Sequence, residues 1–208
     1  MRKYFLIALA AISLFVQSCA TTTTLVKEGK TRIVVLETIP RASEPKWVNS
    51  TKEFWEKKDS YYYRGVSQGY TDPDVAKQDA EAIARTNLAR QIKLVLLDEF
   101  RRALEAQKYD PTIGGYLSDS FVSVVDSLEI GGSVLAESYS QRIREESYKT
   151  VLKDYWRSFV LVKLPRGEYD KCSMRAFQNL KEQVQANESA KDLAEQTEKR
   201  FRESQNKN

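Results

Sequence analysis

A cysteine near the amino terminus carries the clearest chemical pattern in the sequence. Cys19 ends the run Val16-Gln17-Ser18-Cys19, with an aliphatic residue three places before it and a small residue directly before it. This is the outline of a lipobox, in which the cysteine thiol takes a diacylglyceryl group through a thioether bond. A lipoprotein signal peptidase then cuts on the amino-terminal side of the cysteine. The pattern predicts lipid attachment at Cys19 and cleavage between Ser18 and Cys19.

The residues before the cysteine fit export. Arg2 and Lys3 are positive, and Tyr4 to Val16 is apolar and uncharged. That run is too short to span ~30 Å of hydrocarbon, which needs about 20 residues, but it suits the apolar part of a secretory signal. The alternative is an ordinary signal cut after Ala20, since Ser18 and Ala20 also satisfy the small-residue rule. We favour lipidation because it explains where the cysteine lies.

The residue after the cysteine bears on localisation. In common Gram-negative sorting, Asp at this position retains a lipoprotein in the inner membrane, whereas this chain has Ala20. The following threonines, residues 21–24, lack the acidic cluster that some bacteria use for surface export. Acyl chains contribute ~0.8 kcal/mol per buried methylene, so two or more hold a protein firmly. We expect a lipid-anchored outer-membrane protein, carrying fatty acyl groups such as palmitate and facing the periplasm.

The rest of the chain offers little catalytic chemistry. It has no histidine, the commonest general base and metal ligand. It contains no phosphate-binding or dinucleotide-binding glycine motif and no G-x-S-x-G. The formal charge of +4 falls to +2 once Arg2 and Lys3 leave with residues 1–18, too weak a bias to indicate nucleic acid. We expect a non-enzymatic protein with no cofactor and no metal.

The second of the two cysteines is Cys172. With Cys19 lipidated, no intrachain disulfide can form, even in an oxidising compartment. Cys172 is either buried, which we favour, or a free thiol able to link two chains.

Composition divides the chain into four parts. Residues 1–18 form the signal peptide, and 19–44 form a lipidated, flexible tether that includes a possible short strand at 31–39. Residues 45–170 form an α+β domain, and 171–208 form a helical to disordered polar tail.

The longest predicted element is a helix that follows Asp72. Asp72 suits the N-cap, and Pro73 suits the first helical position. Alanines and then larger apolar residues recur every four positions over roughly 35 residues, which would span ~55 Å. The alanine half, with Ala80 at its centre, is predicted to lie against a tyrosine-rich strand at 61–70, on the face that carries Gly65 and Gly69. A flavin or sugar site is the alternative role for these tyrosines.

Shorter patterns complete the order β-α-(α)-β-β-α. A short helix is predicted at 47–55 and another at 118–128, after a break at Gly114-Gly115. Two strands, 134–145 and 156–164, should form an antiparallel hairpin, and a helix from 168 to about 201 should fray in its polar second half. The predicted fold is α+β, with about three antiparallel strands packed against a long helix.

In this order the chain resembles the Lpp-twenty family of Gram-negative outer-membrane lipoproteins. The likeness covers roughly residues 45–170 and implies a dodecin-like or flagellar-accessory domain, in a family that includes flagellum-associated lipoproteins that assemble into rings. The family supplies no catalytic residues. The residues that carry the likeness are Pro45-Lys46-Trp47-Val48, Arg64-Gly65-Val66-Ser67, Ala76 to Leu88 with Asn87-Leu88-Ala89, and Trp156 to Pro165.

Three functions remain open from the sequence. The first is a scaffold or self-assembling component of the cell envelope, with a homo-oligomer or an envelope or flagellar protein as its partner. The second is a periplasmic binding module for peptidoglycan or an envelope synthase. The third is a hydrolase, although no residue pair in the sequence indicates one.

Overall fold

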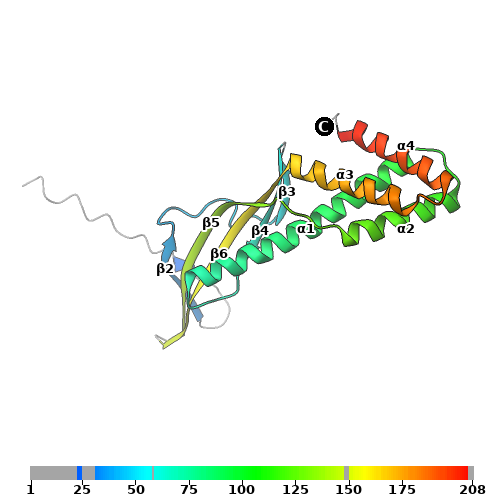
Figure 1. Cartoon of the computed structure of the whole chain (residues 1–208). Helices are drawn as coiled ribbons and strands as arrows, with labels where there is room; N and C mark the ends of the chain where they lie inside the picture. The colour runs from blue at the N-terminus through cyan, green and yellow to red at the C-terminus, as the bar shows by residue number, and fades with distance from the viewer. Residues whose placement is uncertain (1–22, 25–30, 58, 148–149, 206–208) are drawn as a thin grey trace, which may run out of the picture.

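The computed structural model describes residues 23–24, 31–57, 59–147 and 150–205, and within them the chain is α+β. One antiparallel sheet has the strand order β1-β2-β5-β6-β4-β3. Four helices extend from it toward the far end of the molecule (Figure 1). The elements are β1 (Thr23–Thr24), β2 (Thr31–Ile39), β3 (Phe54–Lys57), β4 (Ser60–Val66), α1 (Pro73–Glu105), α2 (Pro111–Ser127), β5 (Val134–Ser147), β6 (Thr150–Pro165), α3 (Arg166–Gln183) and α4 (Glu188–Gln205).

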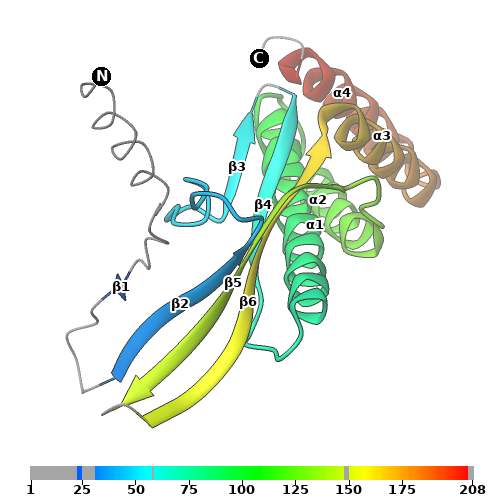
Figure 2. The ribbon, with the colours of Figure 1, turned by 90° about the vertical axis from the view of Figure 1, so that its left-hand side faces the viewer.

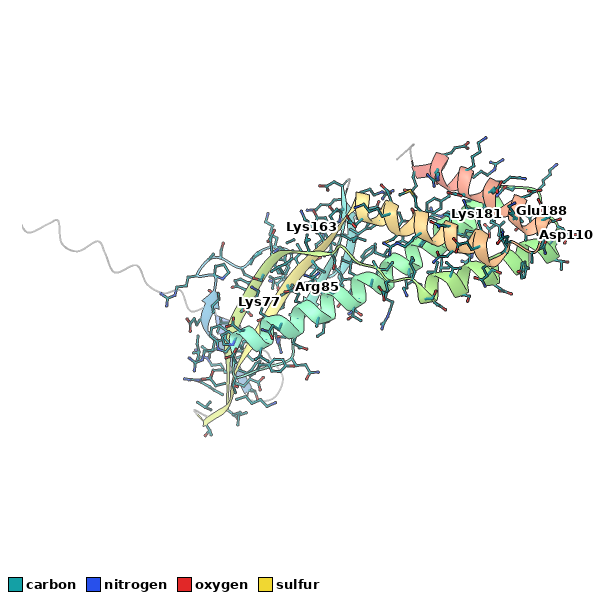
Figure 3. The ribbon with its side chains drawn as sticks, in the orientation of Figure 1. Lys77, Arg85, Asp110, Lys163, Lys181 and Glu188 are labelled. Atoms are coloured by element: carbon teal, nitrogen blue, oxygen red, sulfur yellow. The ribbon has the colours of Figure 1, made fainter. Side chains whose placement is uncertain are left out.

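The start of α1 confirms the predicted cap. The Asp72 carboxylate accepts hydrogen bonds from the backbone N–H of Asp74 at 2.8 Å and of Val75 at 3.1 Å, and Pro73 opens the helix. These contacts satisfy donors that a helix start leaves without partners. With 33 residues, α1 is about 50 Å long. It runs from the sheet, near Lys77, to the end of the molecule marked by Asp110 (Figure 3).

The first half of α1 packs closely on the sheet. Ala76, Ala80 and Ala84 are fully buried. A Cβ on Gly65 would lie 2.1 Å from the Ala80 carbonyl oxygen, so only glycine fits there. The predicted contact is confirmed for Gly65 but wrong for Gly69. Since β4 ends at residue 66, Gly69 lies beyond the strand, and a Cβ there would meet the Tyr155 ring at 2.6 Å instead.

The second half of α1 packs against helices through large side chains. Phe100 stacks on Phe121 of α2 with ring centroids 3.9 Å apart, and Phe177 of α3 meets Phe201 of α4 at 5.0 Å. Phe177 also contacts both of the other rings. These four side chains, one from each helix, join the helices into a single core. We call this part of the molecule the helical end, and the sheet with the first half of α1 the sheet end.

The sheet is wider than the three strands predicted. Those three, β4, β5 and β6, lie at its centre, and β5 and β6 form the expected antiparallel hairpin. The strand suggested at 31–39 is β2, which pairs along β5, so part of the segment predicted as tether lies in the sheet. The three strands β2, β5 and β6 continue past the start of α1 as a ribbon (Figure 2).

The helix predicted at 47–55 is wrong. Its last residues, Phe54 and Trp55, begin β3, which pairs with β4. Phe54 stacks on Tyr61 and Trp55 stacks on Tyr62, each pair with centroids 6.0 Å apart. Such cross-strand aromatic pairs stabilise a hairpin, and they outweigh a helical spacing that covers only two turns.

The start of the second helix also differs from the prediction. α2 begins at Pro111, with Asp110 as its N-cap, so Gly114 and Gly115 lie inside a helix rather than at a break. Gly114 leaves room for the Tyr109 ring, whose Cε2 atom would be 2.1 Å from a Cβ at that position.

The polar carboxy-terminal segment is a packed helix rather than a fraying one. A turn after Val184 reverses the chain, and the Asn187 side chain caps α4 by accepting from the Ala190 N–H at 3.1 Å. One face of α4 enters the core, through Ala190, Leu193, Ala194, Thr197 and Phe201.

Candidate functional site

Arg166 stands where the sheet meets the helical end. It follows β6 directly as the first residue of α3, and its backbone N–H donates to the Asp59 carbonyl at 2.8 Å. Its guanidinium donates to the Tyr61 hydroxyl and to Glu56 Oε1, both at 2.6 Å, and to the Gln205 side-chain oxygen. The same guanidinium lies 5.4 Å from the Tyr61 ring centroid. Arg166 therefore ties β3, β4 and α4 together.

Two buried tyrosines lie beneath this guanidinium. Burial raises the pKa of Tyr61, although the positive charge of Arg166 opposes the rise. Burial, and then the Glu99 carboxylate, raise the pKa of Tyr169, whose hydroxyl donates to Glu99 Oε2. Both phenols therefore stay protonated at neutral pH. The Tyr169 hydroxyl donates to Glu99, and the Tyr61 hydroxyl accepts from Arg166.

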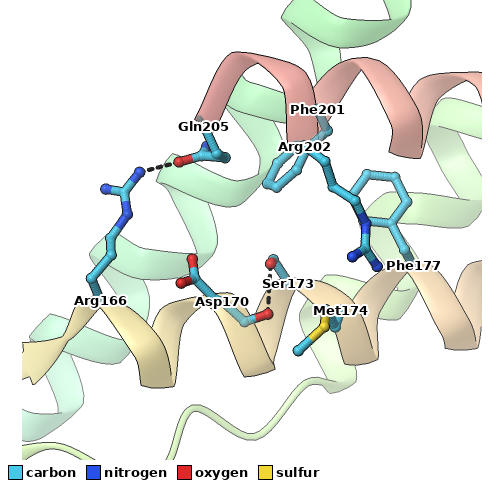
Figure 4. A pocket seen from close by; sticks show the side chains of 8 residues that line it. All are labelled: Arg166, Asp170, Ser173, Met174, Phe177, Phe201, Arg202 and Gln205. Carbon is cyan, nitrogen blue, oxygen red and sulfur yellow. Dashed lines mark hydrogen bonds between the residues drawn. The ribbon is translucent and has the colours of Figure 1, made fainter. Parts of the chain in front are cut away.

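A cavity of about 310 Å³ opens between α3 and α4 beside Arg166 (Figure 4). Its apolar part consists of Met174, Phe177 and Phe201, and its polar part includes two guanidiniums and one carboxylate. The lining residues are Arg166, Asp170, Ser173, Met174, Phe177, Phe201, Arg202 and Gln205.

The polar groups of the cavity are held by hydrogen bonds and ion pairs within α3 and α4. The Ser173 hydroxyl donates to the Asp170 carbonyl at 2.8 Å, so no base in the lining activates it. Arg202 pairs with Glu198 at 2.5 Å, and Glu198 also pairs with Lys181 at 2.9 Å. Burial raises the pKa of Glu198, but the two cations outweigh it and lower that pKa overall. An apolar floor beside fixed cations suits a small molecule with an apolar body and an anionic group.

The predicted lipid attachment residue, Cys19, and its neighbour at the cleavage site, Ser18, lie outside the described residues. Cys172, on α3, is 2% exposed, which confirms the favoured interpretation. Burial also raises the pKa of its thiol.

The tyrosines of the predicted strand take part in packing. Tyr61 and Tyr63 are buried in the core, and Tyr62 stacks on Trp55 with the Lys57 ammonium 5.0 Å from its ring centroid.

No group of three or more acidic, cysteine or histidine residues in the described ranges could hold a metal ion. Among the same ranges, no helix has the length and apolarity needed to cross a membrane.

The two edges of the sheet are its other candidate site. β3 forms one edge, and within the described part of the chain no strand pairs with its outer side. The opposite edge is β2, where, among the residues that the structure describes, β1 pairs only with Val34 and Ile33. The remainder of β2 exposes Leu36 by 41% and Ile39 by 46%.

The sequence prediction missed every residue of the cavity. Arg166 precedes the helix predicted from 168, and Phe201 lies at the end of that helix, in the half that was expected to fray. A usable signal was present, because Ala190, Ala194, Thr197 and Phe201 recur at helical spacing and share one face of the helix.

Comparison with known proteins adds no relative: no family model, curated protein or solved structure matches this chain.

Proposed function

We propose that the protein is a non-enzymatic lipoprotein of the outer membrane, held through lipid on Cys19, that acts as a self-assembling scaffold facing the periplasm. The observation that carries this proposal is that, within the described residues, the outer side of β3 and most of the outer side of β2 have no partner strand. An edge strand presents unpaired N–H and C=O groups, and a strand of another chain can pair with them. The edge residues of β2 add apolar surface, with Leu36 and Ile39 exposed.

The two edges differ, so pairing between them is head-to-tail. When β2 of one copy meets β3 of the next, the contact is heterologous, and it forms a ring if the rotation closes. Anchoring to a surface favours such contacts because it raises the local concentration. The resemblance to the Lpp-twenty family and to its dodecin-like arrangement supports the same proposal, as do its ring-forming, flagellum-associated members.

The oligomeric state tests self-assembly. We expect residues 20–208, which lack the predicted signal and lipid, to form oligomers at high micromolar concentration in analytical ultracentrifugation. A lysine in place of Leu36 should give monomers, since a charge at a sheet edge opposes pairing. Val122→Lys on α2 is the matched control, because Val122 and Leu36 are both 41% exposed. A monomeric parent chain would overturn intrinsic self-assembly.

A second function, a periplasmic binding module, is favoured by the cavity beside Arg166. It would take a small anionic molecule with an apolar body, such as a fragment of the cell envelope. Native mass spectrometry of protein released gently from membranes should show bound mass that Arg202→Gln reduces. Arg101→Gln is the control, since Arg101 is similarly exposed, at 65% against 55% for Arg202, and also pairs with an acid on its own helix. Equal bound mass in both variants would exclude the cavity.

A further inference from the structure

The free end of the β5–β6 hairpin carries an apolar group with no role in the fold. Val151 is 50% exposed and Leu152 is 53% exposed. These adjacent residues open β6, on the ribbon that continues past α1 (Figure 2). The pairing with β5 shifts here, since Lys153 pairs with Glu145 and Val151 pairs with Glu146. Leu152 is therefore an extra residue in a bulge, which breaks the strict alternation of side chains between the two faces.

The register of the sheet places the start of the described chain at the same level of the ribbon. Thr24 pairs with Ile33, Ile33 pairs with Glu145, and Glu145 pairs with Lys153. One cross-strand row thus joins β1 to the residue that follows Leu152. Three steps between neighbouring strands separate Thr24 from Lys153, which amounts to ~14 Å.

A short length of chain joins the predicted lipid site to this row. Cys19 precedes Thr24 by five residues, which reach at most ~17 Å when fully extended. The lipid on Cys19 must lie in the bilayer, so it holds the hairpin end within roughly 30 Å of the membrane surface. The helical end can stand farther away, since α1 is about 50 Å long and leads away from the ribbon.

Cations beside the hairpin end also suit a phospholipid surface. Asp154 accepts hydrogen bonds from both Arg142 and Arg144 at 2.9 Å. In the paired rows at this end of the ribbon, the cations Arg32, Arg142, Arg144 and Lys153 lie beside the acids Glu37, Glu145, Glu146 and Asp154. Lys153, directly after Leu152, is exposed. Cations flanking apolar side chains are the usual composition of a segment that seats in the headgroup region.

We propose that Val151 and Leu152 insert into the interface of the membrane that holds the lipid, so that the protein stands on its hairpin end with the helical end in the periplasm. This inference rests on the proposed function through the lipid on Cys19. It adds a second, non-covalent membrane contact, which sets the orientation of the domain.

The test uses the full acylated protein in vesicles of phosphatidylethanolamine and phosphatidylglycerol. An environment-sensitive fluorophore is attached through Leu152→Cys. The matched site is Tyr116→Cys, 44% exposed on α2 at the helical end. Since Cys172 is buried, the chain without an added cysteine serves as the labelling blank. Lipids with a nitroxide high on the acyl chain should remove roughly half of the emission at residue 152, since such segments seat ~5–10 Å deep, and leave residue 116 unchanged.

Mass spectrometry and vesicle flotation of the same samples separate the possible failures. If the protein is acylated and floats with the vesicles, but aqueous iodide quenches the fluorophore at residue 152, this inference alone is overturned. Protection from iodide without quenching by lipid would also overturn it, because the hairpin end would then contact protein. A chain without acyl groups would overturn the proposed function together with the inference.

Discussion

The two halves of α1 meet the rest of the molecule in opposite ways. At the sheet end, Ala80 brings its backbone against Gly65, and the contact has no room for one added carbon. At the helical end, the large Phe100 side chain packs against Phe121 of α2 and Phe177 of α3. The packing at the sheet end is therefore destabilised when a buried side chain is enlarged, and the packing at the helical end is destabilised when a large side chain is truncated.

This difference matches the division of proposed roles. The close contact at the sheet end fixes the helix on the strands that would carry the membrane contact and the edges for assembly. The helical end holds its cavity between α3 and α4, where packing by side chains alone leaves about 310 Å³ open.

The largest effect is expected from emptying the helical end. Phe100→Ala should lower the free energy of unfolding by about 3–5 kcal/mol, because it leaves a cavity among the rings of the other three helices. Tyr116→Ala, at a residue 44% exposed on α2, should change it by less than ~0.5 kcal/mol. Urea denaturation measures the stability of both variants. Similar midpoints for Phe100→Ala and Tyr116→Ala would contradict the proposed role of the aromatic core.

A smaller effect is expected from overfilling the sheet end. Ala80→Leu should destabilise the protein by ~1–3 kcal/mol, since the helix must move away from β4. Ala82→Leu makes the same change on an exposed position of the same helix, and it should be nearly neutral because leucine is a good helix former. Equal melting temperatures of the two variants would refute the close packing.

The α1 region shows which parts of the fold the sequence could predict. Its cap, its first residue and its stripe of buried positions are local features, and all of them were confirmed. The β5–β6 hairpin was predicted for the same reason, since a short link joins its strands. The close packing of Gly65 was also visible, because only glycine allows such an approach.

Other features depended on contacts between distant residues. Phe54 and Trp55 fit a helical pattern equally well, and only their partners Tyr61 and Tyr62 place them in a strand. α4 was misjudged because alanine and threonine form much of its buried face. The cavity follows from how α3 and α4 pack across their turn, which no local pattern encodes. The lipid site, in contrast, was predicted entirely from the local run around Cys19.

The smallest effect on stability is expected from protonation of Asp154, which lies in the ribbon. Hydrogen bonds from Arg144, and then from Arg142, lower the pKa of Asp154. Because the folded pKa lies below the unfolded value of about 3.9, the stability this group adds is present above that value. It is lost as the pH falls toward the folded pKa. Asp154→Asn removes the titration, so its urea midpoint should fall less steeply below about pH 4. If the urea midpoints of the parent chain and of Asp154→Asn fall equally steeply with decreasing pH, the pairing of Asp154 with Arg142 and Arg144 is contradicted.

The central claim is that lipid on Cys19 holds the sheet end at a membrane and leaves the helical end free. Metabolic labelling with a fatty-acid analogue, followed by membrane fractionation, tests it most directly. The parent chain and Cys172→Ala, which keeps Cys19 and removes the buried thiol, should both carry label and sediment with membranes. Cys19→Ser should carry no label and leave the membrane fraction. Label retained by Cys19→Ser, or absent from the parent chain, would contradict the account.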